Sequence, residues 1–413
     1  MTRKFLYQLN KLCAVLFVVW VCWPWLGQNT GLIGSFLISM GWCLTAVAVN
    51  GRYTTGIDGV LMAFYVVYML LSFLLTGRVY ADYQLYYHLS MVTLFFLPYY
   101  MMRFYHRKGE RTFMGRLAIV AVIFMIVGCI TSSYYTRIDE NIMKTISQAM
   151  DTELVQYRKL GIGSFGFVYM VMLSIIGIVG LLKANSSELK IRAKVLLIVM
   201  GVVGVKCVVD STFTTAILLL VLGVILVFSL SDRSPVRNFL ICLIAIPGVF
   251  LMTDVLGRFL SSLQMESADV TVRLNELGAL LQGEGSGDNI ASRLKYFKHS
   301  IDAFLESPLL GYNFAINPLE RIGSHSEWID IFAIYGLIGG IPLLCSIIIK
   351  LKNTRAMAKE FRLPYYGLLT LIFVIYGFVD PFLRLYHLGF AMFFLLPCIG
   401  CMSDVLQKEE DPV

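Results

Sequence analysis

The chain has 413 residues, of which 58% are hydrophobic and 15% are charged, and its mean hydropathy is +0.74. A soluble domain carries roughly 45–50% apolar and about 25% charged residues, so this apolar excess cannot be hidden in a core. The composition excludes a soluble enzyme and a disordered chain. The net charge of +7 does not indicate a nucleic-acid partner, because most Lys and Arg lie in segments on one side of the predicted membrane. We predict an all-α, polytopic integral membrane protein.

Apolar stretches of about 20 residues, the length that crosses a bilayer, recur along the chain. The first two are joined by a short turn around Gly27–Gly31. The basic residues concentrate in alternate short segments, which predicts that both termini are cytoplasmic. The twelve predicted spans are 12–26, 31–49, 57–76, 84–102, 113–132, 162–183, 193–212, 213–231, 237–255, 327–349, 363–379 and 385–403.

Two outer segments are longer than turns. Residues 133–161 carry apolar side chains at four-residue spacing between charged ones, which is typical of an amphipathic helix on the membrane surface or on the bundle. These apolar residues are Ile138, Ile142, Ile146, Met150 and Leu154. The second segment follows the ninth span and is the only one large enough to shape a site. We therefore divide the chain into a transmembrane bundle (1–255), an extracytoplasmic catalytic loop (256–326) and the last three spans with the C-terminus (327–413).

The long outer loop supplies most of the candidate binding residues. It is predicted to form a helix over 258–282, a flexible break over Gly283–Asn289 and a second helix over 290–305 with one apolar stripe. Arg293 and Lys298 fall at the edges of that stripe, and the helical wheel alone does not say which cation is buried. The candidate substrate-binding residues in and after the loop are Arg258, Arg273, Tyr312, Asn313, Arg321, Ser326 and Glu327.

His325 precedes the tenth span on its outer side. Ser324, with Glu327 three residues later, predicts a capping box and therefore a helix N-terminus that faces outward. Such an end suits a phosphate or pyrophosphate, and its dipole discourages a second proton on His325. The neutral imidazole could act as a base. The alternative interpretation is a structural histidine at the membrane interface beside a helix cap.

Two pairs of opposite charge lie in or near predicted spans. Lys206 and Asp210 are four residues apart inside the seventh span, where charges are costly, so they either neutralise each other or bind substrate. We interpret the similar pair Asp380 and Arg384 as structural, and His88 as a packing residue. No group of His, Cys, Asp and Glu has the sequence spacing of metal ligands, so neither a metal nor a cofactor is predicted.

The residues around His325 are similar to a motif of a known protein family. His325-Ser326, followed after nine residues by Gly336 and then by Gly339, resembles the H-[NSQ]-x9-G-x-x-[GTY] pattern of the bacterial O-antigen ligase and O-antigen polymerase superfamily. Arg293 followed by Pro308-Leu309-Leu310-Gly311 resembles the R…PLxG stretch that leads to the histidine in this family. These motifs cover one short region, whereas the number of spans and the single large outer loop resemble the family over the whole chain.

The resemblance implies a metal-independent glycosyltransferase of the bacterial inner membrane, with an active site that faces the periplasm or cell exterior and no cofactor. Its donor would be an undecaprenyl-pyrophosphate-linked oligosaccharide. His325 would deprotonate the acceptor hydroxyl, Arg293 would hold the pyrophosphate, and the attack would invert the anomeric carbon. The family often has another arginine in a middle span, where this chain has Asp210-Ser211-Thr212-Phe213-Thr214. Alternatives for that second cation are Lys206, Arg258 and Arg273.

The acidic residue after His325-Ser326 makes the motif more similar to repeat-unit polymerases, which transfer the glycan onto a sugar hydroxyl of another lipid-linked repeat unit. One alternative is a ligase that transfers the glycan to lipid A–core. The other is a flippase for lipid-linked oligosaccharides, which should tolerate the loss of His325. The expected partners are the lipid-linked oligosaccharide, membrane lipids and, for a polymerase, a chain-length regulator. No nucleic-acid partner is expected.

Overall fold

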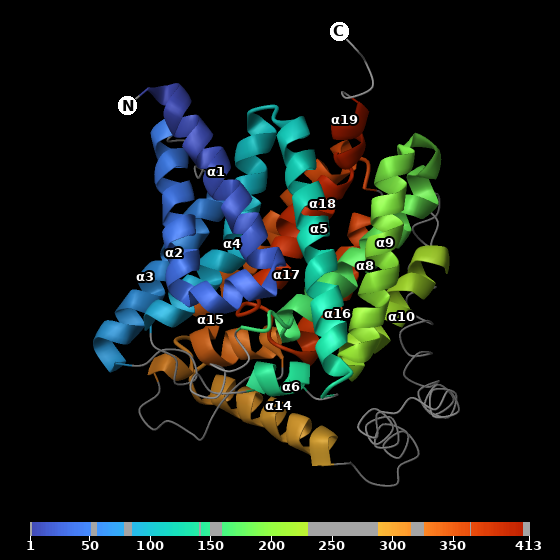
Figure 1. Ribbon diagram of the computed structural model, residues 1–413. Coiled ribbons are helices and arrows are strands. Elements are labelled where there is room, and N and C mark those ends of the chain that lie inside the picture. The colour runs from blue at the N-terminus through green and yellow to red at the C-terminus, as the bar shows by residue number, and fades with distance from the viewer. Residues whose placement is uncertain are drawn as a thin grey trace.

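The computed structural model describes residues 2–50, 56–77, 85–139, 142–148, 159–229, 288–314, 326–363 and 365–407. Every regular element in these ranges is helical, and no strand occurs among them. Most of the longer helices run along one axis as a bundle (Figure 1). The start of α1 and the short helix α19 lie at one end of this bundle, and α6 and α14 lie at the opposite end.

The helices differ widely in length. They are α1 (Arg3–Cys22), α2 (Pro24–Val49), α3 (Ile57–Thr76), α4 (Leu85–Arg107), α5 (Arg111–Thr136), α6 (Ile142–Gln148), α8 (Phe165–Asn185), η2 (Ser186–Glu188), α9 (Ile191–Asp210), α10 (Thr214–Ser229), α14 (Asp288–Glu306), η3 (Tyr312–Phe314), α15 (Glu327–Glu360), α16 (Tyr366–Val379), α17 (Tyr386–Phe390), η4 (Ala391–Leu395), α18 (Leu396–Ile399) and α19 (Met402–Gln407).

Several helices are long and apolar enough to cross a bilayer, which makes this a membrane protein. In the described residues they are α1, α3, α5, α8 with η2, and α15, and α2 is a sixth if its two parts form one span. The predicted count of twelve is therefore not confirmed. The predicted span 237–255 and most of the predicted catalytic loop lie outside the described residues. Exposed apolar side chains such as Val60, Phe64 and Leu74 on α3 fit a lipid-facing surface.

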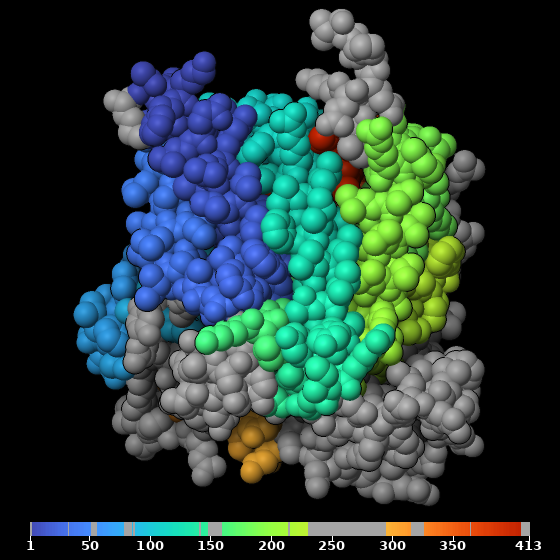
Figure 2. Space-filling model, in the orientation of Figure 1, coloured from blue at the N-terminus to red at the C-terminus, as the bar shows by residue number. Residues whose placement is uncertain are grey.

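The turn between the first two predicted spans begins earlier than predicted. The chain leaves α1 at Trp23, whose backbone is extended, and changes direction a second time at the end of the predicted turn, Gly27–Gly31. Pro24 explains the position, because proline disfavours helical backbone at the residue before it and is well suited to the first position of a helix. α2 then bends by 100° near Gly31, which has a positive φ of 55°. Figure 2 shows α1, α5 and α9 side by side on one face of the bundle.

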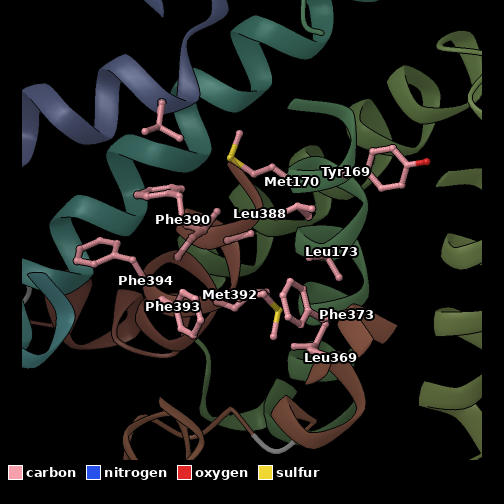
Figure 3. Close-up of a cluster of buried hydrophobic side chains, with 14 of the residues drawn as sticks. Tyr169, Met170, Leu173, Leu369, Phe373, Leu388, Phe390, Met392, Phe393 and Phe394 are labelled. Atoms are coloured by element: carbon pink, nitrogen blue, oxygen red, sulfur yellow. The ribbon is translucent and has the colours of Figure 1, made fainter. Parts of the chain in front are cut away.

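The last predicted span, 385–403, forms the centre of the bundle. It comprises α17, the π-helical turn η4 and α18, which are buried on all sides. Figure 3 shows Phe390, Met392 and Phe393 of this segment among Met170 of α8 and Phe373 of α16. A helix that is apolar all round fits either lipid or a protein core, and here the core surrounds it.

The amphipathic segment predicted over 133–161 is described only in part. α5 extends to Thr136, and α6 follows it. Ile142 and Ile146 of the apolar stripe are buried, and α6 packs on α5 and α8. Of the two positions predicted for this helix, the described part therefore favours the bundle. Ile138 is exposed, and the end of the stripe lies outside the described residues.

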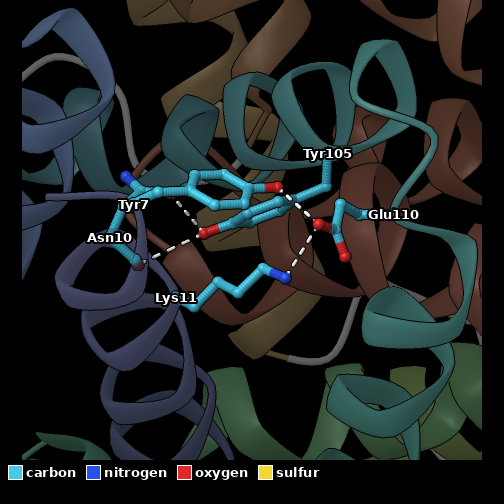
Figure 4. Close-up of polar contacts among 5 residues, drawn as sticks. All are labelled: Tyr7, Asn10, Lys11, Tyr105 and Glu110. Atoms are coloured by element: carbon cyan, nitrogen blue, oxygen red, sulfur yellow. Dashed lines mark hydrogen bonds and ion pairs between the residues drawn. The ribbon is translucent and has the colours of Figure 1, made fainter. Parts of the chain in front are cut away.

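A polar cluster ties α1 to α4 and α5 near the end of the bundle where α1 begins (Figure 4). Tyr7 and Lys11 of α1 each donate a 2.8 Å hydrogen bond to the Glu110 carboxylate, and Tyr105 donates a 2.7 Å bond to Asn10. Partial burial disfavours the ionised form of Glu110. The hydrogen bonds from Lys11 and Tyr7 outweigh this effect and lower the pKa of the carboxyl below its usual value.

Glu110→Gln should lower the stability at neutral pH and should remove part of its pH dependence. The lowered folded-state pKa means that the carboxylate stabilises the fold above its ordinary pKa and that this contribution disappears as the pH falls through the folded value. We expect a loss of about 0.5–1 kcal/mol at pH 7, because both ionic partners are partly exposed. Thermal unfolding in lipid nanodiscs at pH 7 and pH 3.5 measures the difference in stability between Glu110→Gln and wild type.

Glu188→Gln is the matched control, because Glu188 pairs with Arg362 while both side chains are more than half exposed. This variant should unfold within about 0.3 kcal/mol of the wild type, as expected for an exposed pair. If Glu110→Gln and wild type differ equally at both pH values, the assignment of the pH dependence to Glu110 is wrong.

Candidate functional site

The structure describes part of the predicted site. Arg258, Arg273, Arg321 and His325 lie outside the described residues. Arg293 belongs to α14, but its side chain is not described. The described candidates are Lys206, Asp210, Tyr312, Asn313, Ser326 and Glu327. The last four lie on η3 and at the start of α15, and η3 contacts α15. The site as a whole therefore remains a prediction.

The start of α15 differs from the predicted capping box. The N-cap residue is Ser326, and its side chain makes no capping hydrogen bond; instead its hydroxyl donates to the carbonyl of Gly377 at 3.3 Å. In a capping box, a side chain of the first helical turn accepts a hydrogen bond from the backbone N–H of the N-cap residue. Here Asp330 makes the most similar contact, because its Oδ2 accepts a hydrogen bond from the backbone N–H of Ser326 at 3.5 Å. The predicted role of Glu327 in this box is wrong, because its carboxylate points to another segment.

The Glu327 carboxylate binds the loop between α16 and α17. One oxygen, Oε2, accepts backbone N–H groups from Phe382 and Leu383 at 2.8 and 3.0 Å. Trp328 adds to this contact, since its indole N–H donates to Val374 at 2.8 Å and its ring lies 4.8 Å from that of Phe382. Glu327 is almost completely buried. It therefore fixes the position of the helix start, and a role in substrate binding remains a prediction.

Asp330 connects the start of α15 to α14. Its Oδ1 accepts a 2.8 Å hydrogen bond from the hydroxyl of Ser300, and both side chains are buried. The next turn of α14 places Ala303 in the same buried contact. The helix that carries Arg293 is thus attached directly to the helix that begins two residues after His325.

α15 is broken at Gly336, whose φ of 58° and ψ of −166° are not helical. The segment that follows α14 fills the break: Leu337 N–H donates to Pro308 at 2.9 Å, and Ile338 N–H donates to Leu309 at 3.0 Å. Gly311, with φ 72°, packs its backbone against that of Gly336. A Cβ atom on either glycine would overlap the other segment's backbone.

These contacts bring together residues from two of the motifs identified in the sequence. Pro308-Leu309-Leu310-Gly311 and Gly336 bind each other through their backbones. Gly339 is also a packing residue, since a Cβ atom there would overlap the ring of Tyr68. Both Gly336 and Gly339 therefore lie at close contacts that leave no room for a side chain.

A buried hydrogen-bond network lies beside the break. His88 Nε2 is 2.8 Å from the hydroxyl of Tyr65 and 3.1 Å from that of Tyr335, the residue before Gly336. Tyr68 donates a 2.6 Å hydrogen bond to the carbonyl of Leu310. His88 was predicted as a packing residue; it is buried, and it also joins α3, α4 and α15 through polar contacts. The sequence offered no periodic signal that pairs these three residues.

Asn313 and Tyr312 follow directly in η3. Asn313 is 1% exposed, and neither its Oδ1 nor its Nδ2 has a hydrogen-bond partner among the described residues. Leaving a buried carboxamide unsatisfied costs free energy, and such groups are often reserved for a ligand or a water molecule. Tyr312 is half-buried beside it. Asn313 is therefore the described candidate with unused hydrogen-bonding capacity.

Lys206 and Asp210 form the predicted pair on α9. The ammonium group lies 2.8 and 2.9 Å from the two carboxylate oxygens, and half of the lysine side chain is exposed. α9 packs mainly on α5 and α8, whereas α14 packs on α15 and η3. The structure thus favours mutual neutralisation for this pair. Arg384 lies elsewhere: its charge interacts with Glu327 and with His88, so it belongs to the surroundings of the α15 start.

Among the residues that the structure describes, no three His, Cys, Asp or Glu side chains are grouped so that they could hold a metal ion. No protein-family model and no curated protein matches the chain. The geometry of the described residues and the motifs of the sequence are therefore the basis for assigning a function.

Gly311→Ala and Gly336→Ala should each destabilise the protein by more than backbone strain alone. A left-handed backbone costs a non-glycine residue about 1–2 kcal/mol. At these two positions the added methyl group also meets backbone atoms, so we expect a total of about 3 kcal/mol or more. Thermal unfolding of the purified variants in nanodiscs measures the difference.

Gly109→Ala is the control for strain, since Gly109 has φ 70° and open space around its Cα. It should lose only about 1–2 kcal/mol. Equal losses in all three variants would show that the close contact between Gly311 and Gly336 contributes nothing.

Glu327→Ala should lower the stability of the fold much more than Glu360→Ala at the other end of α15. The first change leaves two buried N–H groups without an acceptor, at about 1–3 kcal/mol each. Glu360 is 61% exposed, so its loss should cost at most about 0.5 kcal/mol. The measurement is the unfolding temperature of each purified variant. Similar temperatures would mean that the carboxylate of Glu327 does not hold the 382–383 backbone.

Proposed function

We propose that this protein is a polysaccharide polymerase that joins lipid-linked repeat units of an O-antigen or capsule. The observation that carries the proposal is the backbone contact between Gly311 and Gly336. Two motifs that are separate in the sequence, and that the proposed superfamily shares, pack against each other there. A chance similarity of the two motifs would not require them to meet in space. The contact also supports the proposal that α14, which contains Arg293, lies close to the segment that follows His325.

In the proposed reaction, His325 takes the proton from a sugar hydroxyl of the acceptor repeat unit. The resulting oxygen nucleophile attacks the anomeric carbon of the donor glycan from the side opposite the pyrophosphate. A new C–O bond forms while the bond to the pyrophosphate breaks, so undecaprenyl pyrophosphate leaves and the configuration inverts. Arg293 binds the phosphate oxygens and offsets the charge of the leaving group. The proposed reaction needs no metal or cofactor.

The proposal includes a location and partners. The site would face the periplasm or cell exterior of a bacterial inner membrane, and both termini would be cytoplasmic. Consistent with this, the start of α1 and α19 lie at one end of the bundle and α14 lies at the other (Figure 1). The partners would be the lipid-linked oligosaccharide, membrane lipids and a chain-length regulator.

Purified protein in liposomes, supplied only with undecaprenyl-pyrophosphate-linked repeat units, should produce a ladder of glycan multiples. His325→Ala should reduce the rate by at least about 100-fold, the contribution expected of a general base. Product size on gels and release of undecaprenyl pyrophosphate are the measurements. His106→Ala is the matched control, because His106 pairs with Glu360 at the far end of α15 from His325.

Other outcomes would replace the proposal. Transfer that occurs only after lipid A–core is added would identify a ligase. Translocation of the lipid-linked oligosaccharide, without transfer and unaffected by His325→Ala, would identify a flippase. A ladder that persists in His325→Ala would retain the polymerase and reject the proposed base.

A further inference from the structure

α14 has three distinct sides. Ser300 and Ala303 face α15 and are buried, with exposed fractions of 1% and 2%. Ile301 and Leu305 are 48% and 68% exposed. At 100° per residue, this second pair lies about 150° around the helix from the first. Phe304, at one edge of the apolar stripe, is half-buried against α15, whereas the side of the stripe with Ile301 and Leu305 points away from that helix.

The third side is charged. Lys295, Lys298 and Glu306 are exposed on it, next to the apolar stripe. α14 runs across the end of the bundle and not along its axis (Figure 1). An exposed apolar stripe beside lysines, on a helix that crosses the end of a membrane bundle, is the arrangement of helices that lie in the membrane interface.

The stripe continues onto the lipid-facing side of α15. Leu309 follows Leu305 at the same four-residue spacing and is exposed. Its carbonyl accepts the N–H of Ile338, so the two residues are direct neighbours. Ile338 and, one turn later, Ile341 are exposed on α15, a helix that can cross the bilayer. The apolar surface is thus continuous from a membrane-spanning helix to α14, which identifies bilayer lipid as the molecule that covers it.

We propose that α14 is an interfacial membrane helix whose residues Ile301, Leu305 and Leu309 insert among the acyl chains of the adjacent leaflet. Lys295 and Lys298 then lie at the level of the lipid phosphates, since lysine can extend its charged end towards water from an apolar surface. This inference does not depend on the polymerase proposal. If that proposal holds, an inserted α14 would keep Arg293 at the depth of a lipid-bound pyrophosphate.

Cysteine labelling in proteoliposomes tests the insertion. Leu305→Cys and Glu306→Cys occupy adjacent positions on the apolar and charged sides. A membrane-impermeant maleimide should label Leu305→Cys at least 10-fold more slowly than Glu306→Cys, because a thiol in lipid neither meets the reagent nor ionises. A nitroxide attached to Leu305→Cys in detergent should, after reconstitution, collide more often with oxygen, which dissolves in lipid, than with a water-soluble nickel chelate. Both variants insert into the liposomes with the same distribution of orientations, so this distribution does not affect the ratio of the two labelling rates. Wild-type protein gives the background of the native cysteines, none of which is exposed among those described.

Ile301→Cys and Asp302→Cys form a second matched pair one turn earlier and should show the same ratio. Equal rates with the impermeant reagent would show that the stripe faces water, which overturns the proposal. Slow maleimide labelling of both Leu305→Cys and Ile301→Cys, with nitroxides there that collide rarely with both oxygen and the nickel chelate, would show that protein covers the stripe, which also overturns it. No lipid-linked substrate is present in these assays, so their result is separate from that of the polymerase test.

Discussion

A broken helix in a membrane must find acceptors for the backbone N–H groups that the break releases, because lipid offers none. α15 breaks at Gly336, and the carbonyl groups of Pro308 and Leu309 meet this need. The match requires the two backbones to approach more closely than any side chain permits, which is why both segments have a glycine at the contact. The break thereby determines the position of the 308–314 segment and, through it, the end of α14.

The part of α15 before the break is held at both ends. At its start, the Glu327 carboxylate binds the backbone after α16; at its end, Tyr335 joins the network of His88 and Tyr65. Between them, Asp330 binds Ser300 of α14. A short helix with fixed ends is a rigid support, and rigid supports suit residues that must hold a precise geometry for chemistry.

The sequence was most informative where the physical signal is local. The predicted span 57–76 has the same limits as α3, because an apolar run with glycines at both ends defines a helix without help from distant residues. Glu327 was misassigned because its partners are 55 and 56 positions away. The buried centre formed by α17 and η4 could not be told from a lipid-facing helix, since lipid and protein core are equally apolar. The approach of Gly311 to Gly336 required a view of both segments in space.

If the proposed pyrophosphate site lies beside the α15 start, the charged residues there restrict which cations could bind the phosphates. Glu327 and Asp330 are buried within one turn of each other, and an ionised carboxylate at either position would repel a phosphate. Arg384 interacts with Glu327, so part of its charge is already offset, and Lys206 is neutralised by Asp210. A pyrophosphate would therefore need positive charge from outside this acidic group. The loop arginines are the natural source, because a segment that approaches from the water side can bring guanidinium groups to the phosphates without burying them in the bundle.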